Sequence, residues 1–164
     1  LAYQPDYSTL MVGANDVCSW GEHYAAALAQ FDADVNGAIT RLVTFRRNVK
    51  LLMVPIPDVY QVYTLGAGTS CQRVWNTIRL CGRLLSSSLT DADRADFVER
   101  WRIANAKLEE IAERFPGNVK FDPSLANFQF DQEHISTIDC FHPSVSGQNL
   151  VAELTWRGGW LGAF

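Results

Sequence analysis

The sequence predicts an α/β domain with a parallel β-sheet. Three short segments have the apolar, β-branched composition of buried strands, and helix-like patterns separate them along the chain. These segments are residues 7–12, 49–56 and 119–122. Strands that alternate with helices are typical of α/β domains, so the expected sheet is parallel.

Length and composition fit one globular domain with a hydrophobic core. The chain has 164 residues, of which 48% are hydrophobic and 20% are charged, which is ordinary for such proteins. It contains no run of about 18 apolar residues, so no transmembrane segment is expected. The net charge is −4, and the densest basic group, Arg46, Arg47 and Lys50, falls where a helix is expected to end. Nucleic acid is therefore not an expected partner.

Helical spacing of apolar residues predicts helices at 33–47 and from Thr90 to about residue 115. In the second helix, the Thr90 hydroxyl can cap the first turn, and Asp93 suits the positive end of the helix dipole. A last helix is expected to begin at Ser144 or Ser146.

The stretch 57–88 lacks a clear period, and we expect a long loop there with one short helix. Loops of this length are often functional. Because it follows a strand end, it is expected either to line the pocket for a substrate or to be a disulfide-stapled loop without substrate contact.

Gly13-Ala14-Asn15-Asp16 directly follows the first expected strand. In a parallel sheet, ligands bind where the strands end, and an asparagine there can point its amide N–H at a developing oxyanion. Glycine lets the backbone turn sharply. The same four residues are also typical of a simple turn, because Asn and Asp favour turns.

Asp139-Cys140-Phe141-His142-Pro143 comes just before the last expected helix. Asp139 and His142 are three residues apart, so one tight turn can bring the carboxylate to the imidazole. The carboxylate then accepts from one ring nitrogen and holds the tautomer, which leaves the other nitrogen to deprotonate a nucleophile. Taken alone, the motif also fits a loop end beside a surface histidine.

Together, in this order and spacing, the two motifs resemble those of the SGNH hydrolase superfamily, also called the GDSL esterases and lipases. Three stretches carry the resemblance, which extends from Pro5 to Trp156. They are 12–18 (VGANDVC), 54–58 (VPIPD) and 139–147 (DCFHPSVSG). Cysteines that follow Asn-Asp and precede Phe-His are similar to those of the extracellular lipase and phospholipase-B-like branch.

The resemblance implies that Asn15 is an oxyanion-hole donor and that Gly13 shapes the loop presenting it. It implies that His142 is the general base and that Asp139 orients it. The implied fold is a flavodoxin-like three-layer α/β/α sandwich around a parallel sheet. The implied activity is hydrolysis of acyl esters, with lipid esters favoured, without a metal ion or an organic cofactor.

The nucleophile block of that superfamily, a Gly-Asp-Ser near the N-terminus, has no counterpart here, since no serine follows Gly-Asp. We therefore expect residues 1–164 to form the C-terminal portion of a single SGNH hydrolase domain, with an incomplete sheet whose N-terminal strands are missing. The expected partner is a second polypeptide segment that carries the Gly-Asp-Ser block. Without it, the first strand of this chain would expose an apolar edge.

Two other functions fit the same residues. The absent nucleophile also fits a non-catalytic binding subunit or a remnant of the fold. An acyltransferase would use the same triad to pass the acyl group to an alcohol in place of water. The ester hydrolase is the leading hypothesis.

The cysteines are Cys18, Cys71, Cys81 and Cys140, an even number without C-x-x-C spacing, which is compatible with two disulfides. Cys71 and Cys81 share one expected loop, so we expect them to pair. Cys18 would then pair with Cys140 and hold the oxyanion donor and the base in fixed relation. The alternatives are a bond to a cysteine on the second segment, or four reduced cysteines in a cytosolic protein. Two disulfides would indicate secretion.

Overall fold

The sheet is built around β2 (Lys50–Val54), which lies between β1 (Tyr7–Met11) and β3 (Val119–Phe121). The computed structural model describes residues 5–162. Both outer strands pair with β2 in parallel, and the register makes β1 and β2 end together. The parallel sheet expected from the alternation of strands and helices is confirmed.

The composition of β2 explains its central position. Leu51 and Met53 belong to the larger hydrophobic cluster on one face of the sheet, whereas Leu52 and Val54 belong to a smaller cluster on the other. All four side chains are at most 3% exposed. A strand that is apolar on both faces is stable only between two layers.

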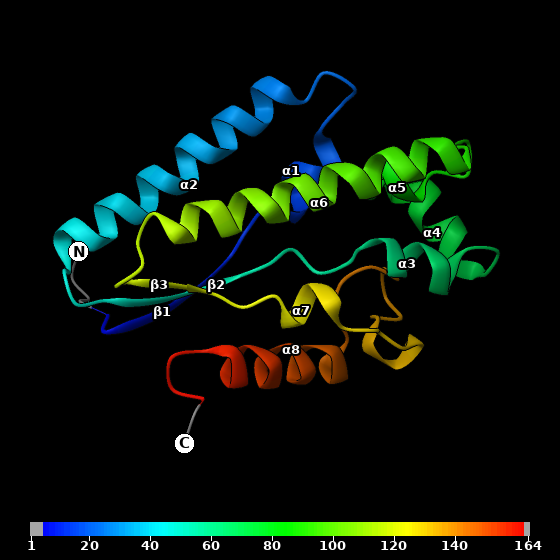
Figure 1. Cartoon of the computed structure of the whole chain (residues 1–164). Coiled ribbons are helices and arrows are strands. Elements are labelled where there is room, and N and C mark those ends of the chain that lie inside the picture. The colour runs from blue at the N-terminus through cyan, green and yellow to red at the C-terminus, as the bar shows by residue number, and fades with distance from the viewer. Residues whose placement is uncertain (1–4, 163–164) are drawn as a thin grey trace.

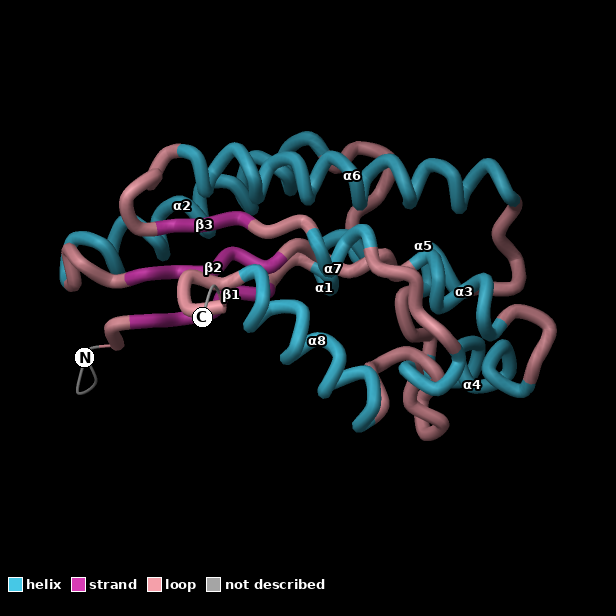
Figure 2. The backbone as a smooth tube through the Cα atoms, turned by 60° about the horizontal axis from the view of Figure 1, so that its bottom comes forward, coloured by secondary structure: helices cyan, strands magenta, loops and turns pink. Residues whose placement is uncertain are grey.

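Helices form those two layers (Figures 1 and 2). One face of the sheet is covered by α2 (Ala25–Phe45) and α6 (Asp91–Glu113), and the other by α7 (Ser124–Asn127) and α8 (Val145–Gly158). The three-layer α/β/α sandwich is therefore confirmed. Helix α2 begins eight residues before the expected residue 33.

Two helix starts follow the expected capping chemistry. Thr90 and Asp93 form a capping box, in which Asp93 Oδ2 accepts the Thr90 N–H at 2.7 Å and Thr90 Oγ1 accepts the Asp93 N–H at 3.3 Å. Of the two serines considered for the last helix, Ser144 is the cap, because its hydroxyl accepts the Gly147 N–H at 3.1 Å.

The expectation of a long loop at 57–88 is wrong. Three short helices occupy most of it, and their apolar side chains Val62, Trp75, Leu84 and Leu85 are buried in the larger cluster. Helices of four to nine residues are too short for a helical period to be recognised. Besides α7, the short helices among the described residues are α1 (Ala14–Ser19), α3 (Tyr60–Gly66), α4 (Ser70–Ile78), α5 (Gly82–Leu85) and the 3₁₀ turn η1 (Gln132–His134).

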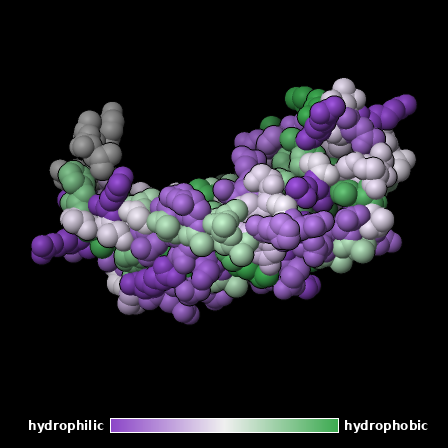
Figure 3. Space-filling model, turned by 90° about the horizontal axis from the view of Figure 1, so that it is seen from above, coloured by the Kyte–Doolittle hydropathy of each residue, from purple (hydrophilic) through white to green (hydrophobic). Residues whose placement is uncertain are grey.

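Hydrophilic side chains cover much of the face seen from above in Figure 3, with smaller apolar areas between them. This is the side on which α2 and α6 cover the sheet. None of the helices within residues 5–162 is long and apolar enough to cross a membrane.

Candidate active site

A cavity of about 410 Å³ opens at the carboxyl ends of β1 and β2. Its walls come from the end of β1 with α1, from the residues between β2 and α3, from α3 itself, and from the segment 130–143. Most of the lining side chains are apolar, and the polar ones are Asn15, Asp16, His134 and His142. Ligands are expected at this edge of a parallel sheet, and the structure brings both sequence motifs to it.

His142 and Asp139 form a hydrogen-bonded pair at this cavity. His142 Nδ1 lies 2.7 Å from Asp139 Oδ2, and Asp139 Oδ1 accepts the backbone N–H groups of Phe141 at 2.9 Å and His142 at 3.0 Å. An ionised carboxylate only accepts, so it holds the ring proton on Nδ1 and leaves the lone pair on Nε2. The pair has the tautomer that a general base requires.

The Asp139 carboxyl group favours its ionised form. Partial burial raises its pKa, but the hydrogen bonds from the His142 ring and from the two backbone N–H groups outweigh that effect, and the net pKa is lowered. The Asp139 side chain is 27% exposed, whereas that of His142 is 64% exposed. The carboxylate is thus partly shielded, and the imidazole stays open to solvent.

Contacts with α4 hold the turn that carries this pair. Cys140 has a φ of 56°, a left-handed value that is uncommon for a residue with a Cβ. Its carbonyl accepts a hydrogen bond from the indole Nε1–H of Trp75 at 3.0 Å, and its sulfur is bonded to Cys71. Trp75 is only 1% exposed. A buried side chain and a covalent bond therefore maintain the turn.

A short antiparallel contact fixes the backbone on the other side of His142. Ile135 and Pro143 form an isolated β-bridge, and Ser136 N–H donates to the carbonyl of His142 at 2.8 Å. The backbone that carries the imidazole is therefore held by a hydrogen bond at His142 itself.

Asn15 reaches the same cavity from the first turn of α1. Gly13, just before this helix, has a φ of 106°, and a Cβ at this position would lie 2.7 Å from Ile56 Cδ1. Both the conformation and the close approach require glycine. The Asn15 side chain is exposed, and it has no hydrogen-bond partner in the part of the chain that the structure describes. Its amide is available to a ligand oxygen.

The described residues place no nucleophile in the cavity. No serine, threonine or cysteine among residues 5–162 lines it. Ser144, two residues after His142, accepts the Gly147 N–H at 3.1 Å and donates to the Glu133 carbonyl at 2.5 Å. Its hydroxyl is committed to the start of α8.

The disulfide pairing expected from the sequence, Cys71–Cys81 with Cys18–Cys140, is wrong. The structure pairs Cys18 with Cys81 and Cys71 with Cys140, at Cα–Cα distances of 4.8 and 5.5 Å. Most of α4 lies between Cys71 and Cys81, and a helix rises about 1.5 Å per residue, so this segment separates the two cysteines beyond the reach of a disulfide. Each motif is thus linked to the α4–α5 segment, and not to the other motif.

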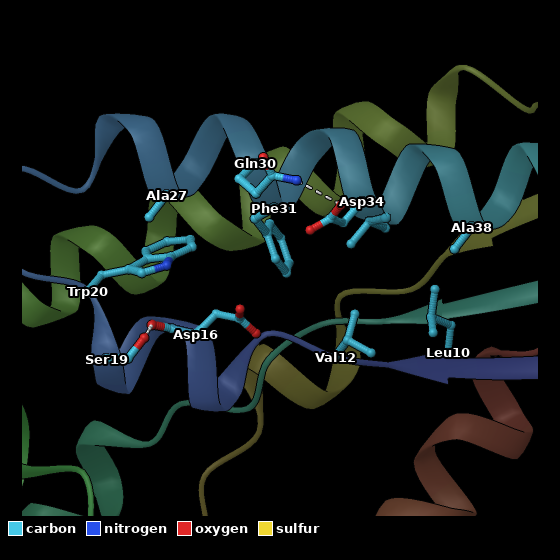
Figure 4. Close-up of a pocket in the computed structure, with 11 residues that line it drawn as sticks. Leu10, Val12, Asp16, Ser19, Trp20, Ala27, Gln30, Phe31, Asp34 and Ala38 are labelled. Carbon is cyan, nitrogen blue, oxygen red and sulfur yellow. Dashed lines mark hydrogen bonds between the residues drawn. The ribbon is translucent and has the colours of Figure 1, made fainter.

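A second hollow of about 490 Å³ lies between α2 and the end of β1 (Figure 4). Trp20 and Phe31 meet edge to face in its wall, with ring centroids 5.8 Å apart. It shares Val12 and Asp16 with the first cavity but includes neither His142 nor Asn15. The candidate chemistry therefore belongs to the first cavity.

Sequence reasoning missed two residues that matter here. His134 lines the cavity but stands in no motif, and no local signal distinguishes it. Trp75 lies between two cysteines in the sequence. That position is a signal that could have indicated a structural role beside a disulfide.

A protein-family model described as GDSL-like Lipase/Acylhydrolase matches residues 1–155. No curated protein and no solved structure gives a significant match. The matched range includes both motifs and every residue that lines the cavity.

Proposed function

The chain belongs to the GDSL-like lipase/acylhydrolase family, and we propose that it supplies the base and an oxyanion donor of a serine ester hydrolase. His142 is the general base, Asp139 orients it, and Asn15 is the donor. The nucleophilic serine comes from a polypeptide segment outside this chain. The observation that carries the proposal is the His142–Asp139 pair at 2.7 Å, on the wall of a cavity that Asn15 also lines.

The reaction begins when the serine Oγ bonds to the ester carbonyl carbon and its proton passes to Nε2 of His142. Asp139 stays ionised and stabilises the imidazolium. The Asn15 amide donates a hydrogen bond to the carbonyl oxygen as negative charge develops there. The bond between the carbonyl carbon and the alcohol oxygen then breaks, and the alcohol leaves with the proton from His142. Water then repeats these steps on the acyl-enzyme, which releases the acid and restores the serine.

The lining of the cavity supports acyl esters, and lipid esters in particular, as substrates. A volume of about 410 Å³ is within the usual range for small-molecule sites. Apolar walls favour an acyl chain over a charged group, which would lose its hydration. The apolar lining includes Ile56, Val59, Val62, Phe130, Ile135 and Phe141.

The free edge of β1 supports the position of the nucleophile segment. Among the described strands, β1 pairs with β2 alone. Met11 at its end is 55% exposed, the adjacent Val12 is 36% exposed, and both line the cavity. A strand added at this edge would cover them and would end at the same side of the sheet as Asn15.

Secretion is part of the proposal. Its support is the pair of disulfides, Cys18–Cys81 and Cys71–Cys140, which involve all four cysteines. Such bonds persist in oxidising compartments and are rare in the reducing cytosol.

The decisive variant is His142→Ala in the complete protein, assayed with short-chain esters. We expect kcat/KM to fall by roughly a thousandfold or more, because loss of a triad base usually has this effect. His23, an exposed histidine that does not line the cavity, provides the matched control, and His23→Ala should remain close to wild type. Activity of His142→Ala within about tenfold of wild type would overturn the proposal.

A fluorophosphonate probe tests the nucleophile separately. We expect it to label a serine on a segment outside this chain. Preparations in which no polypeptide is labelled would instead favour a subunit that binds esters without hydrolysing them.

A further inference from the structure

We propose that His134 is a second, substrate-binding histidine, whose Nε2–H donates a hydrogen bond to an oxygen in the alcohol part of the ester. The inference rests on the proposed ester hydrolase and specifies its substrate class. The preferred substrates are esters of polyhydroxy alcohols such as glycerol, and not esters of plain alkyl alcohols.

His134 lies beside His142 across the short antiparallel contact. Ser144 N–H donates to the carbonyl of His134 at 2.9 Å, next to the bridge between Ile135 and Pro143. This register puts the two histidines at diagonal positions on one face of the contact, and diagonal neighbours lie roughly 7–8 Å apart. Both line the cavity, so one substrate molecule can meet both rings.

The tautomer of His134 is opposite to that of His142. His134 Nδ1 accepts the backbone N–H of Asp131 at 3.0 Å. A ring nitrogen that accepts carries no proton, so the proton of the neutral imidazole is on Nε2. In His142, Asp139 holds the proton on Nδ1. The cavity therefore contains one ring that takes a proton and one that donates a hydrogen bond.

No group among residues 5–162 accepts the Nε2–H of His134. The nearest acid is Glu133, whose Oε1 is 3.9 Å from Nε2 and whose side chain is 74% exposed; this distance is too long for a hydrogen bond. The ring packs edge to face against Phe128 and Phe130, with centroid distances of 6.1 and 6.2 Å, and the His134 side chain is 11% exposed. A shielded donor is stabilised when a ligand oxygen satisfies it.

The position of His142 indicates which part of the ester His134 meets. His142 must return its proton to the leaving alcohol, so its Nε2 lies within hydrogen-bond reach of that oxygen. The neighbouring ring is then beside the alcohol and not beside the far end of the acyl chain. A hydroxyl group on the alcohol is an acceptor at the right side of the reacting bond.

Two variants separate this donor from the structural role of the ring. His134→Asn keeps an acceptor near Nδ1 for the Asp131 N–H but removes the donor at Nε2. His134→Gln keeps an amide N–H near Nε2 but removes the Nδ1 acceptor. His23→Asn is the control away from the cavity.

The substrates are glycerol 1-monobutyrate and n-propyl butyrate, which share the acyl group and differ by two hydroxyl groups. The readout in the complete protein is the ratio of their kcat/KM values. We expect His134→Asn to lower the preference for the glycerol ester about tenfold, the effect of one hydrogen bond. His134→Gln should retain most of the preference, at reduced thermal stability, and His23→Asn should retain all of it.

The opposite order, in which His134→Gln loses the preference and His134→Asn keeps it, would overturn the inference, as would an equal loss for both esters. Binding of glycerol 1-monobutyrate, followed by NMR of the ligand in a His142→Ala background, repeats the comparison without turnover. If the wild type hydrolyses neither ester, the proposed function fails, while weaker binding to the His134→Asn protein still supports the donor. Equal binding to the Asn and Gln variants would overturn it.

Discussion

The side chains of His142 and Asn15 line the same cavity but are held in different ways. Asp139, the Trp75 indole and a disulfide all act on the turn, whereas the Asn15 side chain has no partner within residues 5–162. In the proposed reaction, the base must present one tautomer before the substrate arrives, whereas the oxyanion donor makes its hydrogen bond only with the reacting ligand. Substitutions that remove these contacts of the turn should therefore affect both structure and activity, whereas substitutions at Asn15 should affect activity alone.

The largest expected effect is that of Asp139→Asn. An asparagine can still accept the N–H groups of Phe141 and His142, so the turn should persist. Its NH₂ group would face His142 Nδ1 and move the ring proton to Nε2, which removes the base. We expect kcat/KM to fall about 10⁴-fold. The control Asp122→Asn, at an aspartate that accepts the Ser124 N–H at 2.9 Å, should change activity little. A loss below about tenfold would show that Asp139 does not set the tautomer.

Asn15→Ala should lower kcat about 10²- to 10³-fold, as loss of an oxyanion donor usually does. Because the side chain is exposed and unpartnered among the described residues, the melting temperature should stay within about a degree of wild type. Asn149→Ala, an exposed position in α8, is the matched control. A clearly lower unfolding temperature of Asn15→Ala would show that the Asn15 side chain also has a structural role, as the contacts of the His142 turn do.

Removal of the disulfides one at a time sharpens the contrast. The double variants Cys18→Ala/Cys81→Ala and Cys71→Ala/Cys140→Ala should each lose about 2–5 kcal/mol of unfolding free energy, since the bonds span similar separations of 63 and 69 residues. Urea unfolding measures this loss. Below the unfolding transition, the second variant should show the lower kcat, because Cys140 is in the turn that carries His142, the proposed base. Equal kcat values would mean that the disulfide does not position His142.

The smallest effect concerns acid pH. The pKa of Asp139 is lowered in the folded chain, so its contribution to stability is present above the pKa of the unfolded chain and is lost as the pH falls through the folded pKa. Because the side chain is 27% exposed, solvent screening keeps the contribution small. Carboxyl ¹³C NMR should give a midpoint below the usual aspartate range, and Asp139→Asn should be less sensitive to acid. A midpoint at or above that range would show that the hydrogen bonds to Asp139 do not stabilise its ionised form.

Residues close in the chain could be placed from the sequence. The Thr90–Asp93 capping box follows from residue type and spacing, and Asp139 and His142 are only three residues apart, so a single turn is sufficient to pair them. Strand β2 was recognisable because it is apolar on both faces. In each case the decisive interaction is local or the pattern repeats along one element.

Other features depend on segments far apart in the chain, and only the tertiary structure decided them. The cysteines pair across 63 and 69 residues, and the choice depends on α4, a helix that is stable because Trp75 packs in the core. His134 likewise becomes a cavity residue only when the segment 130–143 folds against α1 and the end of β1. The sequence by itself thus determined the strands, the longer helices and the pairing of Asp139 with His142, because these patterns and interactions are local. Packing decided the disulfides and the second histidine, because the energy of a long-range contact depends on every element that brings its two ends together.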